Sequence, residues 1–159
     1  MANEISTAGI LLKYKAFAGD FPSTTPSGFT IIPNIKAIPE FNPEPSTLDV
    51  TDLSDTEWMR YIPGLKDPGG ALAFTANFTS AFKTAWEAVV SAYETAQSQT
   101  PVQNMWFEVM VPNFGSFYFA GMPSELGLPA SEVDAVFEGD VYITPNLIHG
   151  WDTSSTGSA

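Results

Sequence analysis

Apolar and polar residues alternate along several short segments of this chain, which is typical of β-strands with one buried face. The clearest case is ALAFTANFT at residues 71–79, where Leu72, Phe74, Ala76 and Phe78 alternate with smaller or polar residues. Shorter segments of the same type are GILLKYK at 9–15, STLDV at 46–50, MWFEVMVP at 105–112 and SFYFAGM at 116–122. The pattern predicts a mainly β fold.

The hydrophobic period changes from two to about 3.6 after Thr79. Thr79 or Ser80 is a suitable N-cap, and Pro101 prevents the helix from continuing beyond it. One α-helix is therefore predicted at about residues 80–96. Its apolar stripe consists of Phe82, Trp86, Val89, Val90 and Tyr93.

Proline and glycine divide the remaining segments. Residues 28–41 read as extended chain interrupted by two prolines, and NFG at 113–115 predicts a hairpin turn. The segment 133–146 predicts either a final pair of strands or one bent strand, with a bulge at Gly139. We expect a single β-sandwich domain over residues 1–150, flanked by the one helix, and a disordered tail at 151–159.

The segment DLSDTEWMRYIPGLKDPGG, residues 52–70, is long for a connection within a small domain. Loops beyond about 12–15 residues in compact domains are usually functional or disordered. This segment also carries Trp58, Tyr61, Ile62 and Leu65, which a solvated loop does not need. One interpretation is that these side chains contact a partner. The other is that residues 58–62 form a short helical turn folded onto the domain's own core.

The charge of the chain is strongly negative and unevenly distributed. Six Lys and Arg residues oppose 18 Asp and Glu residues, a formal charge of −12, and residues 84–159 contain no Lys or Arg. Proteins that grip DNA or RNA neutralise phosphates with basic side chains, so nucleic-acid binding is not expected. The excess of acids indicates either a surface that repels nucleic acid or simple solubility.

The sequence offers little catalytic or metal-binding chemistry. There is no cysteine, and His149 is the only histidine. The acids Asp49, Asp52, Asp55 and Glu57 lack the spacing of an EF-hand loop, and no phosphate-binding glycine motif occurs. No apolar run approaches the length of a membrane span, and the start MANEISTAGI does not resemble a secretion signal. We expect no enzyme, no cofactor, no metal and no membrane insertion.

The run EPSTLDVTDLSDTEWMRYIPGLKDPGGALAFTANF, residues 44–78, resembles the major tail protein (tail tube protein) family of long-tailed bacteriophages. The similarity lies in a strand that leads through TDLSD, PGLKD and GG into an alternating strand. It continues through the helix, FEVMVPNFGSFYFAGM and VFEGDVYIT, and so covers most of the chain.

The resemblance implies a structural virion protein that forms homohexameric rings stacked into a tail tube, through which DNA leaves the head. It implies assembly in the host cytoplasm, with a tape measure protein, a tail terminator and tail-tip initiator proteins as partners. DNA would pass through the lumen without specific binding. The loop 52–70 would reach the neighbouring ring. Its contact residues would be Trp58, Tyr61, Ile62 and Leu65, and Arg60 and Lys66 would meet carboxylates there.

Three acids are candidates for the lumen wall or an outer surface. Glu108 lies on the less apolar face of its predicted strand, and Glu138 and Asp140 flank the predicted bend at Gly139. The alternative function is a monomeric sugar- or protein-binding β-sandwich, such as an adhesion module, with exposed Trp and Tyr as its platform. Two carboxylates facing each other across a groove could also cleave a glycoside, but no local motif singles out such a pair.

Overall fold

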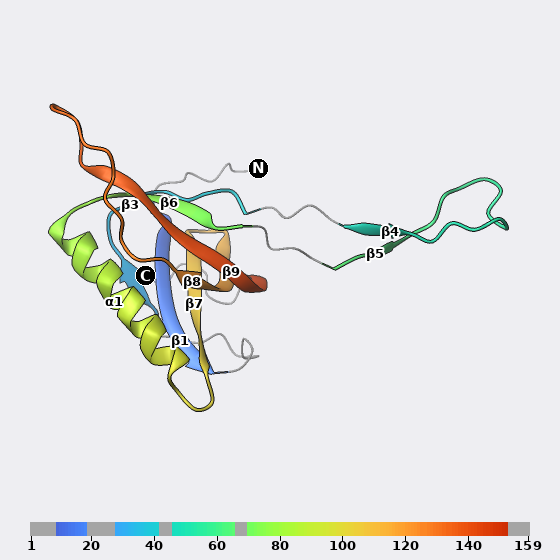
Figure 1. Ribbon diagram of the computed structural model, residues 1–159, viewed down its shortest axis with the longest axis horizontal. Coiled ribbons are helices and arrows are strands. Elements are labelled where there is room, and N and C mark those ends of the chain that lie inside the picture. The colour runs from blue at the N-terminus through green and yellow to red at the C-terminus, as the bar shows by residue number, and fades with distance from the viewer. Residues whose placement is uncertain (1–8, 19–27, 42–45, 66–69, 153–159) are drawn as a thin grey trace.

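The computed structural model describes residues 9–18, 28–41, 46–65 and 70–152 (Figure 1). These residues form one helix, a seven-stranded antiparallel sheet and a separate two-stranded sheet. The elements are β1 (Leu11–Ala18), β2 (Thr30–Ile32), β3 (Ile35–Ala37), β4 (Thr47–Asp49), β5 (Tyr61–Pro63), β6 (Leu72–Asn77), α1 (Ser80–Gln97), β7 (Gln103–Val111), β8 (Gly115–Pro123) and β9 (Glu138–Asp152).

The large sheet has the strand order β2-β1-β7-β8-β9-β6-β3, and β9 connects its two halves. The first part of β9, Glu138 to Ile143, pairs with β6, and the part from Ile143 to Asp152 pairs with β8. The sheet therefore curls along this one long strand (Figure 1). From Thr144 onwards, β9 pairs with β8 alone among the described strands.

Helix α1 covers one face of the sheet, and this contact forms the main core (Figure 1). Thr79, one of the two predicted caps, is the N-cap, and its hydroxyl accepts a hydrogen bond from the Phe82 N–H at 3.1 Å. The predicted helical stripe faces this core, since Phe82, Trp86 and Val89 are fully buried. Trp86 also donates its indole N–H to the Ser124 carbonyl at 2.9 Å, which ties the helix to the segment after β8.

The opposite face, which we call the helix-free face, differs between the two halves of the sheet. Over β1, β7 and β8 it carries a small second core, in which Trp106, Tyr118 and Ala120 are buried with Phe17 and Phe29 against them. Over β6 and β9 it carries polar groups instead. Thr75 there donates its hydroxyl hydrogen bond to Asp140 at 2.8 Å.

The mainly β fold with a single flanking helix is confirmed, and α1 extends to Gln97. Of the segment 133–146, predicted as a pair of strands or one bent strand, only the part from Glu138 onwards is strand; it forms the single strand β9, and Gly139 is not its bulge. Gly139 pairs in regular register with Ala76, and the irregularities of β9 occur against Tyr118–Phe119 and Ala120–Gly121. Its lack of a side chain matters because a Cβ would lie 2.7 Å from Pro129.

β9 also runs two residues beyond the predicted domain boundary at 150, so Trp151 and Asp152 belong to the sheet and not to a tail. The Trp151 ring makes an edge contact with Phe114 at a centroid distance of 4.7 Å. Residues 153–159 lie outside the described part of the chain. Within the described part, no helix combines the length and the hydropathy needed to cross a membrane.

Candidate functional site

Residues 46–65, which we call the arm, form a β-hairpin that projects away from the large sheet (Figure 1). β4 and β5 pair in antiparallel register from Thr47 opposite Pro63 to Asp49 opposite Tyr61. Two further backbone hydrogen bonds extend the ladder, from Gly64 N–H to the Ser46 carbonyl at 2.7 Å and from Val50 N–H to the Arg60 carbonyl at 3.0 Å. The segment predicted as an irregular loop is thus partly a strand, because Tyr61–Pro63 pairs with β4.

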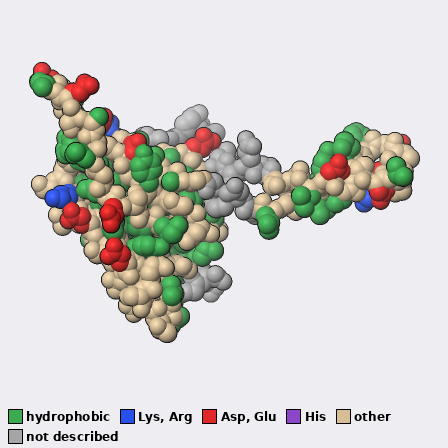
Figure 2. Space-filling model, viewed as in Figure 1, with side chains coloured by type: hydrophobic (Ala, Val, Ile, Leu, Met, Phe, Trp, Pro, Cys, Tyr) green, Lys and Arg blue, Asp and Glu red, His purple; other side chains and the backbone are tan. Residues whose placement is uncertain are grey.

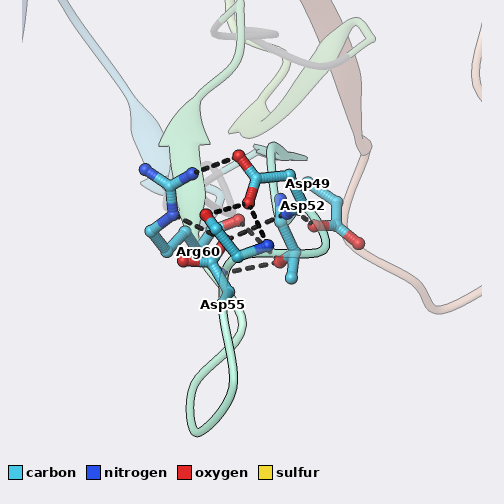
Figure 3. Close-up of polar contacts among 6 residues, drawn as sticks. Asp49, Asp52, Asp55 and Arg60 are labelled. Carbon is cyan, nitrogen blue, oxygen red and sulfur yellow. Dashed lines mark hydrogen bonds and ion pairs between the residues drawn. The ribbon is translucent and has the colours of Figure 1, made fainter.

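A polar network orders the tip of the arm (Figure 3). The Arg60 guanidinium donates from Nε to Asp55 Oδ2 at 2.8 Å and from Nη2 to Asp52 Oδ2 at 3.3 Å. The Arg60 backbone N–H donates to the Thr51 hydroxyl at 2.8 Å, across the base of the turn. Arg60 therefore binds its own arm and fixes the shape of the turn.

The three aspartates of the tip accept hydrogen bonds that favour their charged forms. Bonds from Ser54 lower the pKa of Asp52, and bonds from the Asp52 N–H and from Arg60 lower the pKa of Asp55. Thr51 lowers the pKa of Asp49 in the same way. These carboxylates are therefore ionised at neutral pH and act as turn-forming groups.

The arm exposes most of its large apolar side chains. Trp58 is 80% exposed and Leu65 is 94% exposed. A two-stranded hairpin has no core of its own, and contiguous exposed apolar surface marks interaction sites. Figure 2 shows hydrophobic side chains, in green, along the arm. The exposed set is Leu48, Val50, Leu53, Trp58, Met59, Tyr61, Ile62 and Leu65.

The interpretation of residues 58–62 as a helical turn on the domain's own core is therefore wrong. Trp58 lies on the projecting arm, and Tyr61 and Ile62 belong to β5 with about half of each side chain exposed. The predicted contact residues Trp58, Arg60, Tyr61, Ile62 and Leu65 all lie on this arm. Lys66 lies outside the described residues.

The three candidate acids are all on the helix-free face of the large sheet, but they differ in exposure. Glu108 is only 5% exposed and accepts a hydrogen bond from the Tyr118 hydroxyl at 3.0 Å, so its prediction as a lumen or surface acid is wrong. The error arose because β7 is buried on both faces. Glu138 is half-buried and Asp140 is exposed, which leaves both available at a surface.

Lysines accompany these acids on the helix-free face. Lys36 forms an ion pair with Glu138, and Lys13, which stands opposite Glu108 in the β1–β7 register, is 8% exposed. Lys15 follows on the same face of β1. Lys13, Lys15 and Lys36 therefore lie on the same face as Glu108, Glu138 and Asp140 and offset the charge of these three acids.

The described residues offer no metal centre, since no group of three or more metal-ligating side chains converges among them. The aspartates of the arm are held by Arg60, Thr51, Ser54 and backbone N–H groups. His149 is exposed and lies beside the Tyr118 ring at a centroid distance of 6.1 Å. Neither the aspartates of the arm nor His149 with its neighbour Tyr118 forms a pair of a nucleophile and a general base.

A second apolar region was not predicted from the sequence. Where α1 begins, a pocket of about 380 Å³, which we call the α1 pocket, is lined by Phe78, Phe82, Lys83, Leu126, Leu128 and Phe137 among others. Phe78 stacks on Phe82 and makes an edge contact with Phe137, at centroid distances of 5.4 and 5.5 Å. Leu128 is 88% exposed at its rim. The lining residues come from three distant segments, so no local pattern marks them.

Comparison with known proteins identifies the fold. No family model matches the chain, and no curated protein matches it. Among solved structures, it is similar to a chain of the anti-feeding prophage cap (AFP tube terminating cap), at 10% identity and a TM-score of 0.62 over 97% of this chain and 94% of that one. It is also similar to a chain from the tail of an empty GTA particle refined with C6 symmetry, at 15% identity and a TM-score of 0.54 over 92% and 96%.

Proposed function

We propose that this protein is a structural subunit of a phage-type tail, and more specifically the subunit of its tube, in which hexameric rings stack and enclose a channel for DNA. The observation that carries the proposal is the arm. It is an ordered hairpin whose apolar side chains have no partner surface within the described part of the chain. The fold shared with chains from a tube cap and a C6-symmetric tail supports the same class of assembly.

The arm suits contact between rings. Large aromatic side chains are enriched at interface hot spots, and Trp58 and Tyr61 are both presented to solvent here. The network around Arg60 holds the turn in shape before any partner binds, which reduces the ordering cost of association. We infer that the arm of one subunit docks on a subunit of the next ring.

Open strand edges suit closure of a ring. Beyond Tyr14, β1 has no β2 partner among the described residues, and beyond Ile143, β9 has no β6 partner among them. Unpaired edges are a liability in a monomer and an interface in a closed ring. We infer that these edges contribute to contacts between neighbours within one ring.

The helix-free face is the candidate wall of the channel. Lys36 is ion-paired and Lys13 is buried, so these two of the three lysines on this face present no bare ammonium to passing phosphates. With a formal charge of −12 on each subunit, the assembly as a whole would repel DNA and not retain it. The tape measure, terminator and tip initiator proteins are the partners that such a tube requires.

Electron microscopy of the purified protein over a concentration series, with scattering to give the mass in solution, tests this function. Hollow tubes or six-membered rings are expected. A particle that remains a single subunit up to its solubility limit, and that binds a glycan or protein ligand through Trp58 and Tyr61, would contradict the proposal. Such a result would favour a monomeric adhesion module.

A further inference from the structure

The arm and the α1 pocket lie at opposite sides of the molecule (Figure 1). The start of α1 is at the left of that view, and β4 and β5 extend to the right. One subunit therefore cannot seat its arm in its own pocket. Contact between the two regions requires a second copy, and a head-to-tail contact of this kind generates rings or open filaments.

The α1 pocket is mainly apolar and carries one cation. Its walls include three phenylalanine rings, and Lys83 is its only charged lining residue. The Lys83 ammonium has no ion-pair or hydrogen-bond partner among the residues that the structure describes. The first turn of α1 also contains no acid, so the positive end of the helix dipole adds to the charge of Lys83.

The arm tip offers the complementary groups. Asp52 and Asp55 are bound to Arg60, and Asp49 accepts from the Thr51 N–H at 2.9 Å. Glu57 is the remaining acid of the tip, and its carboxylate has no partner among the described residues. Trp58 follows it directly and is largely exposed. An indole suits a pocket lined by aromatic rings, where it can bury about 150–250 Å².

We propose that Trp58 of one subunit occupies the α1 pocket of a second copy, with Glu57 paired to Lys83. The inference rests on the proposed function, because it names the surface that receives the arm. In this contact the apolar Trp58 meets the apolar α1 pocket. Glu57 meets Lys83, and neither of these two charged groups has a partner among the described residues of its own subunit. Each subunit then gives one arm and receives another, as a stack of identical rings requires.

Disulfide trapping tests the contact directly, because the natural chain has no cysteine. The variants Glu57→Cys and Lys83→Cys are prepared separately, mixed under assembly conditions and oxidised. Bridged residues must have Cα atoms within about 7 Å, so only a close contact is trapped. Covalent dimers are expected from the mixture and not from either variant alone. Glu94→Cys, an exposed acid further along α1, is the matched control for Lys83→Cys.

Equal trapping of Glu57→Cys with both helix positions, or none with Lys83→Cys in a mixture that still assembles, would overturn the inference. That outcome would leave the proposed function intact. A wild-type protein that stays a single subunit and binds a glycan or protein ligand through Trp58 and Tyr61 would contradict both. Wild-type assembly is therefore measured first, by scattering.

Charge reversal gives a second, non-covalent test. Glu57→Lys and Lys83→Glu are each expected to raise the protein concentration required for assembly by roughly tenfold, through like-charge repulsion at the contact. With both substitutions in one chain, the arm and the pocket again carry opposite charges, and assembly is expected to recover to within roughly threefold of the wild type. Glu94→Lys makes the same charge change elsewhere and is expected to have no effect. Additive losses in the double variant would overturn the pairing.

Discussion

The body of the protein, residues 9–41 and 70–152 where described, and the arm carry the same kinds of large apolar side chain, but only the body buries them. Trp86 in the body is 0% exposed and Trp58 on the arm is 80% exposed. The body gains stability from its own core, whereas the arm keeps its apolar surface for another molecule. Substitutions in the two regions should therefore separate folding from assembly.

The largest effect on folding is expected from Trp86→Ala. The change empties a fully buried site and removes the hydrogen bond to the Ser124 carbonyl, so it should lower the free energy of unfolding by about 3–5 kcal/mol. Trp58→Ala, its matched control on the arm, should change that free energy by less than about 0.5 kcal/mol. Urea denaturation measures both. Equal losses would contradict the division into body and arm.

A smaller effect is expected from the buried carboxylate on the helix-free face. Tyr118→Phe removes the hydroxyl that donates to Glu108 and should lower the free energy of unfolding by about 1–3 kcal/mol, because the carboxylate stays buried without this donor. Tyr142→Phe, at an exposed position on β9, is the control and should be nearly neutral. Thermal or urea unfolding compares the two. A neutral Tyr118→Phe would show that Glu108 is solvated in solution.

The helix cap should contribute about as much as one ordinary hydrogen bond. Thr79→Ala removes the acceptor for the Phe82 N–H and the hydroxyl bond to Asn34 Oδ1, and should cost about 1 kcal/mol. Thr84→Ala, an exposed position inside α1, should be neutral or slightly stabilising because alanine has the higher helix propensity. Circular dichroism during denaturation measures the difference. Equal effects at both positions would contradict the assigned cap.

The smallest effect is local and depends on pH. The pKa values of Asp52 and Asp55 are lowered in the folded arm, so their contribution to the turn is complete above the ordinary aspartate pKa of about 3.9 and is lost as the pH falls through their lower folded values. Amide chemical shifts of Asp52 and Ser54 in NMR spectra should titrate below that ordinary value. Midpoints at or above it would contradict the network. Asp55→Asn should remove the part of the Asp52 amide transition that comes from the Asp55 carboxylate, which accepts the hydrogen bond of that amide.

The sequence predicted elements that depend on local pattern. The alternation at residues 71–79 and the stripe from Phe82 to Tyr93 identify β6 and α1, and the cap Thr79 is one of the two residues predicted for it. The length and apolar content of residues 52–70 also pointed to the arm. These features depend on the hydrophobic period, on the chemistry of the helix cap and on loop length. Residues close together in the sequence determine all three.

Features that depend on distant residues were missed or predicted wrongly. Alternation on β7 suggested one solvated face, but β1 and β8 bring Lys13 and Tyr118 beside Glu108 and bury it. The strand Tyr61–Pro63 forms because β4 pairs with it. Three residues are too few to show the alternation of apolar and polar side chains that would predict a strand from sequence. The α1 pocket combines side chains such as Phe78 and Phe137 from segments that meet only in the fold.

The central claim is that the arm joins copies of the protein and contributes little to the fold. Sedimentation of the double variant Trp58→Ala with Tyr61→Ala, beside the wild type at equal concentration, tests it most directly. We expect rings or longer assemblies from the wild type, and single subunits with an unchanged unfolding temperature from the variant. An assembly distribution identical to that of the wild type would contradict the claim.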